Sequence, residues 1–434
     1  MNSLNELKEQ WDEFRELSGS AAAPYRKYLV IGGIVLVLAI AVFAAAPALM
    51  KPKTTSPIVS ISATNTKTYS PGAEIKPGDF TVKAKHRDGK TTTLSKDEYT
   101  INTTKAKGYK AATPVVITAK KSGTRTVGQA TNKRKKVIEW EVGNPNSSDV
   151  KAVYYDTGEL SFEGKGNCMS FDAGKMPWEN SDEDVKIKAV TFGKDVAPRT
   201  IDSYFASQEE LTYCDPIPDS VESMRETFSG CLALKTMPDW SKAEKLLDAE
   251  SAFSGCTALK KAYPTPVNLV SIKGAFSDCE QLTRAPDMSR SEYLNSLAQA
   301  FSGCTRLVEV KLPVHARDLT ETFMNCINLE AMPTIPDGAE SMQSTFSGCT
   351  MLKTPSNIPA SVTDITMAFS QCRKLSGEMR IDTKTEENTN VFSDAVTSLK
   401  LNLTGNSPFL NSIALSAQSG NITVNNAKPT QQQS

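Results

Sequence analysis

The clearest pattern along the chain is a set of apolar positions that recurs every 22 to 25 residues in its C-terminal half. Each unit has a central Phe, and all but the terminal units have an apolar residue four positions before it, a Cys three after it and a Leu six after it; the last unit has Asn388 and Ser398 at the outer two positions. Because one unit is too small to bury its own apolar face, the pattern predicts stacked coils that share one core. The central residues are Phe205, Phe228, Phe253, Phe276, Phe301, Phe323, Phe346, Phe369 and Phe392.

Within each unit the spacing predicts a turn followed by a strand. The positions four before, at and three after the Phe would lie on one side of a helical turn. The Leu and the residue three beyond it predict a short extended stretch, which a following Pro ends because proline has no N–H. The first unit has Gln208 in place of the Cys and the last has Ala395, as expected of terminal coils that face solvent.

The unit Phe-Ser-Gly-Cys-x-x-Leu, with Met or Ile before it and Pro after it, resembles the BspA-like leucine-rich-repeat surface proteins over about residues 195–400. The resemblance implies a solenoid of α/β or 3-10/β coils over residues 201–400. Residues 150–200 resemble the β-hairpin cap that precedes such arrays, with residues 156–158 at the hairpin turn. Residues 401–434 are expected to form a C-terminal cap and a loose tail.

Seven of the nine cysteines occupy the same place in the unit, while Cys168 and Cys214 lie apart. Disulfides between adjacent coils are one interpretation, since coils stack about 4.8 Å apart. Equivalent side chains in a parallel stack point the same way, however, whereas a disulfide needs converging Cβ atoms. The geometry therefore favours a column of buried thiols that act as small apolar fillers. Cys214 is expected to be the more exposed cysteine.

Residues 57–142 have a different texture. Short runs rich in Val, Thr and Lys alternate with Pro-Gly, Asp-Gly and Ser-Gly pairs, which predicts a β-sandwich of about one hundred residues. The stretch TYSPGAEIKPGDFTVKAKHRDGKTTTL resembles the bacterial immunoglobulin-like domains of surface-protein stalks. The resemblance implies a spacer or adhesion module without catalysis.

Residues 28–50 carry no charged side chain, and a helix of this length crosses a bilayer core. They predict a retained single-pass anchor, with cleavage near residues 44–48 as the rival interpretation. Residues 1–27 carry an apolar stripe and predict a cytoplasmic amphipathic helix. The expected fold class is therefore mixed: an N-terminal transmembrane helix, an all-β immunoglobulin-like sandwich and a leucine-rich-repeat solenoid. The expected location is the cell membrane, with the N-terminus cytoplasmic and the bulk of the chain extracellular.

Basic and acidic side chains are balanced over the whole chain but unevenly distributed along it. The chain holds 49 Lys plus Arg and 49 Asp plus Glu, a balance that argues against a nucleic-acid partner. Residues 57–142 hold 17 basic and 7 acidic side chains, whereas residues 143–434 hold 26 and 37. The densest basic run is interpreted as a solvated strand end or as a patch for anionic wall polymer or lipid headgroups. Its residues are Lys133, Arg134, Lys135 and Lys136.

The motifs of catalysis and metal binding are missing. Only His86 and His315 occur, and no phosphate loop, nucleophile elbow or His-Glu-x-x-His helix is present. Spacings between the cysteines contain no Cys-x-x-Cys pair. No cofactor, metal or enzymatic activity is therefore expected.

What remains is a row of side chains that follows the repeat Leu. In a curved solenoid the strand face is concave and presents one variable row per coil. The row is interpreted as a binding face for a protein or glycan on a host or neighbouring cell, or as an ordinary solvated face. The alternatives for the whole protein are an envelope component that assembles with other surface proteins and, less favoured, a cell-wall hydrolase. The row comprises Lys235, Lys260, Lys261, Tyr263, Arg284, Glu309, Glu330 and Lys353.

Overall fold

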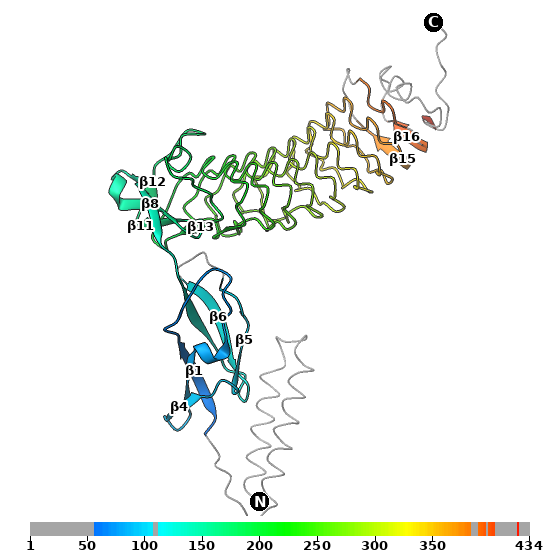
Figure 1. The fold of residues 1–434 in the computed structure, drawn as a ribbon. Helices are drawn as coiled ribbons and strands as arrows, with labels where there is room; N and C mark the ends of the chain where they lie inside the picture. The colour runs from blue at the N-terminus through cyan, green and yellow to red at the C-terminus, as the bar shows by residue number, and fades with distance from the viewer. Residues whose placement is uncertain (1–55, 107–111, 383–388, 396–397, 404–422, 425–434) are drawn as a thin grey trace, which may run out of the picture. The chain divides into compact units, whose positions relative to one another are not determined.

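The computed structural model describes residues 56–106, 112–382, 389–395, 398–403 and 423–424 (Figure 1). Within these ranges the regular elements are β-strands and two short 3-10 turns, η1 (Pro77–Asp79) and η2 (Ser147–Asp149). No helix in these ranges is long and apolar enough to cross a membrane. The prediction of a mixed fold class is wrong, because the described chain is nearly all β. The predicted N-terminal transmembrane helix finds no support there, and residues 1–27 and 28–50 lie outside the described residues.

The first part of the described chain forms two small sheets. Alternate residues of their strands are buried, among them Val82, Ala84, Val115 and Ile117, as expected of strands that cover a core with one face. The immunoglobulin-like resemblance of residues 57–142 stays a prediction. One sheet has the order β1-β3-β4, from β1 (Ile58–Thr64), β3 (Thr81–His86) and β4 (Thr91–Leu94). The other has the order β2-β7-β6-β5, from β2 (Thr68–Tyr69), β7 (Arg125–Asn132), β6 (Ala112–Ala119) and β5 (Tyr99–Ile101).

A five-stranded sheet precedes the repeats. Strands β10 (Val150–Tyr155) and β11 (Glu159–Gly164) form the predicted hairpin, and Gly158 at its turn has a φ of 80°. Strand β8 (Lys136–Glu141) pairs antiparallel with β10, whereas β13 (Ala189–Phe192) and β14 (Tyr213–Cys214) continue from β11 in parallel. The change from antiparallel to parallel pairing converts the hairpin into the first layer of a stack. A smaller pair joins β9 (Gly143–Asn144) to β12 (Asn167–Cys168).

Where the structure describes them, the coils that follow contain no helix, so the predicted helical turn and the α/β or 3-10/β solenoid are also wrong. The cause is backbone conformation: in each coil the residues two before and two after the Phe have φ between 52° and 77°, whereas α-helical residues need negative φ. These left-handed residues are Ser203, Glu226, Ser251, Gly274, Gln299, Glu321, Ser344, Met367 and Asn390 before the Phe, and Ser207, Gly230, Gly255, Asp278, Gly303, Asn325, Gly348, Gln371 and Asp394 after it.

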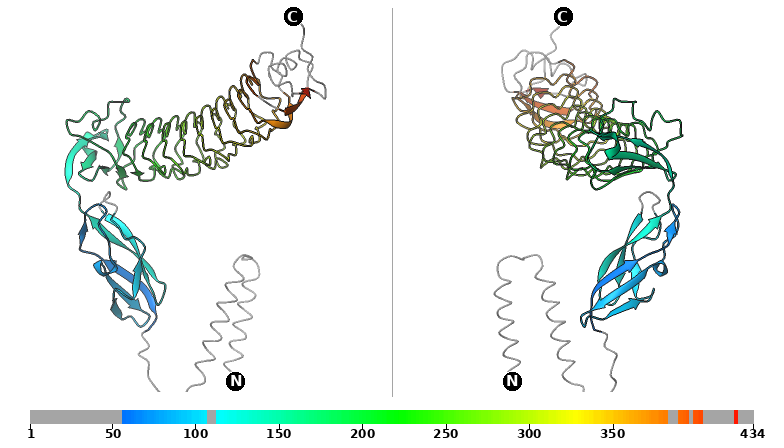
Figure 2. Two further views of the ribbon diagram at one scale, coloured as in Figure 1. Left: turned by 45° about the vertical axis from the view of Figure 1, so that its right-hand side comes forward. Right: turned by 90° about the vertical axis from the view of Figure 1, so that its left-hand side faces the viewer.

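Successive coils lie side by side along the array (Figure 2). The left-handed turns direct backbone hydrogen bonds from one coil to the next. The N–H of Phe253 donates to the carbonyl of Ala275 in the next coil (2.8 Å), and the N–H of Ser251 donates to Lys273 (2.8 Å). The intervening N–H groups close turns inside their own coil, as from Ser254 to Ser251 (3.1 Å). Polar main-chain groups are thus paired without a helix.

The repeated apolar positions form the predicted core. All nine Phe side chains are fully buried, and from Phe228 to Phe392 neighbouring rings stack with centroids 5.3 to 5.9 Å apart and planes within 2 to 19°. The Leu positions from Leu211 to Leu375 are buried as well. The prediction of a shared dry interior is confirmed.

The repeat cysteines are buried and unpaired, as predicted. Each thiol donates a hydrogen bond to the carbonyl of the Phe in the preceding coil, as from Cys304 to Phe276 (3.1 Å). That carbonyl also accepts the N–H of Cys279 in its own coil (3.1 Å), so the thiol supplies its second donor. Cys214 lies in β14 and is buried as well, although its 7% exposure is the largest among the nine cysteines, as predicted.

The repeats end in a parallel sheet. Strand β15 (Ser376–Ile381) pairs with β16 (Ser398–Leu403) over its whole length, and β16 pairs with β17 (Thr423–Val424). Met379, Leu399 and Leu401 are buried there and continue the core. Most of the predicted tail lies outside the described residues.

Removal of one stacked ring should destabilise the whole array. We expect Phe301→Ala to lower the free energy of unfolding by about 3–5 kcal/mol, because a cavity would interrupt the column. Denaturant titration followed by circular dichroism measures the change, with exposed Arg306→Ala of the same coil as control. An equal, small effect of both substitutions would contradict the packing role.

The buried thiols predict a stability that falls in alkali. Burial raises the pKa of Cys256 and of Cys349 to about 12, whereas a thiol in an unfolded chain titrates near about 8.5. Between about pH 9 and 12 the unfolded chain therefore loses protons that the folded chain keeps, and each thiol lowers the free energy of unfolding by about 1.4 kcal/mol per pH unit. Cys256→Ala should reduce this slope by one thiol in denaturant titrations repeated across that range. Identical slopes for the variant and the parent chain would count against it.

Candidate functional site

The predicted row lies on the segment that follows the buried Leu of each coil. Seven of its eight members are exposed, and Tyr263 is half-buried. Parallel bridges join the coils along this segment, as from Arg284 to Glu309 and from Thr236 to Lys261. The fold therefore presents the eight residues, from here the charged row, side by side on successive coils.

The charged row is partly neutralised by its own ion pairs. Arg284 Nε lies 3.3 Å from Glu309, and Lys353 Nζ lies 3.0 Å from Glu330. All four side chains are about half exposed or more, so solvent screening leaves such pairs little net stabilising effect. Each of these side chains could therefore leave its present ion pair and pair with a charged group of a partner protein at little cost.

The N-terminal end of the charged row is a cationic cluster. Lys235 and Lys260 make no ion pair within the described residues, and the N–H of Lys260 donates to the Lys235 carbonyl (3.0 Å). Lys261 Nζ lies 5.2 Å from the centroid of the Tyr263 ring, which is a cation–π contact. An acidic protein surface would match this end.

A groove of about 680 Å³ opens beside the middle of the charged row. Arg284 and Glu309 stand at its edge, Met288 lines it from one coil, and Val310 and Leu312 line it from the next. The sequence carries a signal for the groove in its coil lengths: the coil after Phe276 has 25 residues, whereas the coil after Phe301 has only 22.

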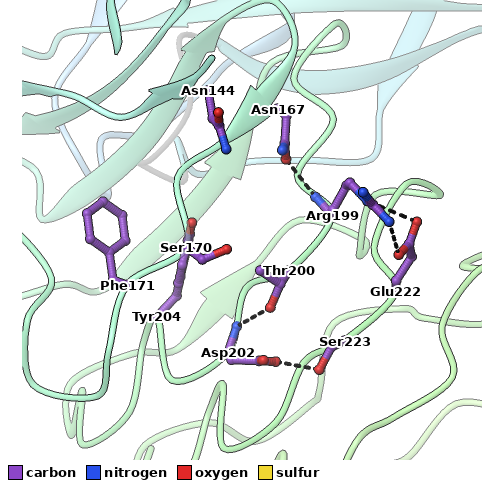
Figure 3. Close-up of a pocket in the computed structure, with 10 residues that line it drawn as sticks. All are labelled: Asn144, Asn167, Ser170, Phe171, Arg199, Thr200, Asp202, Tyr204, Glu222 and Ser223. Atoms are coloured by element: carbon purple, nitrogen blue, oxygen red, sulfur yellow. Dashed lines mark hydrogen bonds and ion pairs between the residues drawn. The ribbon is translucent and has the colours of Figure 1, made fainter. Parts of the chain in front are cut away.

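A second pocket, of about 420 Å³, lies where the cap meets the first coil (Figure 3). Asn144 and Asn167 come from the β9–β12 pair, while Phe171 and Tyr204 provide aromatic walls. The Phe171 ring also packs against Trp178, with centroids 6.1 Å apart. No repeat position predicted these residues, since they lie before the regular coils.

The charged side chains that line this cap pocket pair with neighbouring groups of the same chain. Figure 3 shows Arg199 turned toward Glu222, with Nη2 2.8 Å from the carboxylate, and this hydrogen bond lowers the pKa of Glu222. Asp202 Oδ1 accepts both the Ser223 hydroxyl (2.6 Å) and the Arg225 N–H (2.7 Å). The pocket therefore ties the cap to the second coil.

The basic run that leads into β8, residues 133–136, does not present four free cations. Arg134 is 19% exposed in its side chain, lies 2.8 Å from Glu159 and stands 3.9 Å from the centre of the Tyr155 ring. Lys136 pairs with Glu139 at 2.9 Å. Lys133 and Lys135 are exposed, so a patch for anionic polymer or headgroups would depend on these two.

The described residues offer little catalytic chemistry. Among them no group of three or more His, Cys, Asp or Glu side chains could hold a metal ion. Burial raises the pKa of the repeat thiols, as of Cys256 to about 12, which disfavours the nucleophilic thiolate. His315 lines the groove and is exposed.

Comparison with known proteins identifies the repeats. Residues 199–313 and 273–400 match the model of the BspA type leucine rich repeat region, in six copies. No curated protein matches the chain.

Three solved structures are similar to parts of the chain. A leucine-rich repeat protein of T. pallidum is 20% identical, with 51% of this chain and 84% of that chain covered and a TM-score of 0.31. A leucine-rich cell surface protein of Faecalibacterium prausnitzii is 16% identical, with 64% and 98% covered and a TM-score of 0.33. A leucine-rich repeat protein of Bacteroides ovatus is 15% identical, with 66% and 98% covered and a TM-score of 0.28.

The cap pocket yields a stability prediction. Asp202→Ala should lower the free energy of unfolding by about 1–3 kcal/mol, because it leaves the Arg225 N–H and the Ser223 hydroxyl without their acceptor. Glu222→Ala, which removes only a surface ion pair, should cost less than about 1 kcal/mol. Denaturant titration compares the two, and a larger loss for Glu222→Ala would reverse the assignment.

Proposed function

Residues 199–400 are a BspA-type leucine-rich repeat region, and from this premise we propose that the protein is a bacterial surface protein that binds a protein ligand through its charged row. The coarser part of the proposal comes from the family, which consists of surface proteins whose repeats serve protein interaction. The finer part, the choice of face, comes from the residues.

One observation carries the choice of face. Successive coils hold the same backbone register over a constant core, while the exposed side chain after the Leu changes from coil to coil. A rigid frame with a variable surface loses little backbone entropy on binding, because its coils are already held in register. The cationic cluster and Tyr263 supply the charge and the aromatic contact that protein interfaces favour.

Adhesion to a protein of a host or neighbouring cell is the form of binding that we propose. A glycan ligand would call for polar groups gathered in a pocket, and the cap pocket uses its charged groups internally. We propose no enzymatic activity, since the repeated positions are devoted to packing and the charged groups of the cap pocket pair with their own neighbours.

Substitution of the unpaired lysines tests the charged row. The triple variant Lys235→Ala, Lys260→Ala, Lys261→Ala should bind its protein ligand at least tenfold more weakly, because the cationic cluster is removed. The full chain would be applied to arrays of purified extracellular-matrix and envelope proteins and of glycans, and the Kd of each hit measured by surface plasmon resonance.

A matched control is available on the same and the next coil. Lys242→Ala, Lys245→Ala, Lys273→Ala removes three cations that lie outside the charged row and should leave binding unchanged. Equal losses in both triple variants would show that net charge, not the charged row, governs binding. Hits on glycans alone would overturn the choice of a protein ligand.

A further inference from the structure

The groove beside the charged row arises where the ladder between coils is interrupted. At the position twelve after the Phe, the N–H of Ile217 donates to Asp239 of the next coil (2.9 Å), and that of Thr265 donates to Asp287 (3.0 Å). Within the described residues the equivalent Met288 N–H makes no such bond. The next equivalent position is Pro313, which has no N–H.

Another coil of the same length shows how such a gap is closed. The coil after Phe228 also has 25 residues, and its equivalent residue is Trp240. Trp240 is fully buried, packs edge-on against Phe253 and Phe276, and donates its indole N–H to the Tyr263 carbonyl (3.1 Å). Met288 has no donor in its side chain and cannot make this link.

Among the described residues, the gap leaves residues 310–312 without a main-chain partner. In the described chain, Val310, Lys311 and Leu312 form no backbone hydrogen bond with any other segment. Val310 and Leu312 pack partly against the core, and Val314 beyond them is 75% exposed. An unpaired main chain with alternating apolar side chains accepts an added strand.

The charge on this edge selects the added strand. Lys311 is exposed between the two apolar residues, on the opposite face of the extended chain. An opposite charge directly across a strand pair stabilises it, whereas a like charge destabilises it. Asp287, Glu292 and Glu309 also line the groove and would repel further acidic groups. The complementary strand therefore carries one acidic residue, directly opposite Lys311, between uncharged apolar ones.

We propose that the groove binds an extended segment of a partner protein by strand addition to residues 310–312, with apolar side chains at alternate positions and an acidic residue opposite Lys311. The inference deepens the proposed function, on which it rests, by naming the chemistry of the partner segment. The main chain of the segment supplies the hydrogen bonds that the gap lacks, and its apolar side chains cover the partly buried Val310 and Leu312.

Labelled peptides test the mode of binding. The probe Thr-Val-Glu-Val-Thr should bind the full chain saturably in fluorescence anisotropy. The same peptide with its central amide N-methylated should lose binding at least tenfold, because it keeps the side chains but loses a main-chain donor. Thr-Val-Lys-Val-Thr should bind roughly two- to fivefold more weakly than the acidic probe, and Lys311→Glu should invert that preference.

A variant that closes the gap tests the place. Met288→Trp copies the arrangement of Trp240, so it should abolish peptide binding while its unfolding midpoint stays equal to that of the parent chain or rises. The charged-row lysines remain intact in this variant. Lys245→Ala, on another coil, should bind the acidic probe like the parent chain.

The outcomes separate this inference from the proposed function. Absence of saturable binding to the acidic probe, equal binding of the N-methylated peptide, or unchanged binding by a folded Met288→Trp would each overturn strand addition. If a protein ligand found on the arrays still depends on the charged-row lysines, the proposed function stands without it. If Met288→Trp weakens both the peptide and that ligand, the groove is part of the same binding face.

Discussion

The spacing between coils governs the rest of the structure. Main-chain hydrogen bonds and stacked Phe rings must both fit one repeat distance, and the rings settle at 5.3 to 5.9 Å between centroids. Because the left-handed turns send alternate N–H groups to the next coil, each coil is held mainly by its neighbours. A coil on its own would leave these groups and its apolar face exposed to water. Stability therefore belongs to the array and to the cap that begins it.

The core could be predicted from the sequence because its signal is repeated. The Phe, Cys and Leu columns follow from period and burial alone, and so does the hairpin at residues 156–158. The same period misled the interpretation of local conformation, since apolar residues at spacings of four and three also fit a helix. Gly, Asp and Asn recur two residues after the Phe, as at Gly303, Asp278 and Asn325. These residues tolerate positive φ, and they were the signal for left-handed turns.

The candidate site divides in the same way. The charged row could be predicted because it keeps register with the columns, but its ion pairs could not, since they depend on the rotamers of neighbouring coils. The groove and the cap pocket arise where the repeat is irregular, through a coil of 25 residues beside one of 22 and through the junction with the hairpin sheet. The repeated positions form the core and the aligned surface row, and the irregular coil lengths and the junction with the cap form the groove and the pocket.

The buried thiols make the chain sensitive to oxidation while it folds. A nascent or unfolded molecule offers nine sulfhydryl groups to any oxidant, whereas the stacked array encloses all nine. Wrong cross-links can form only in the interval before the coils close over one another. In an oxidising compartment, the speed of closure would then set the yield of native protein, and a slow-folding variant would be lost to covalent scrambling even when its final state is stable.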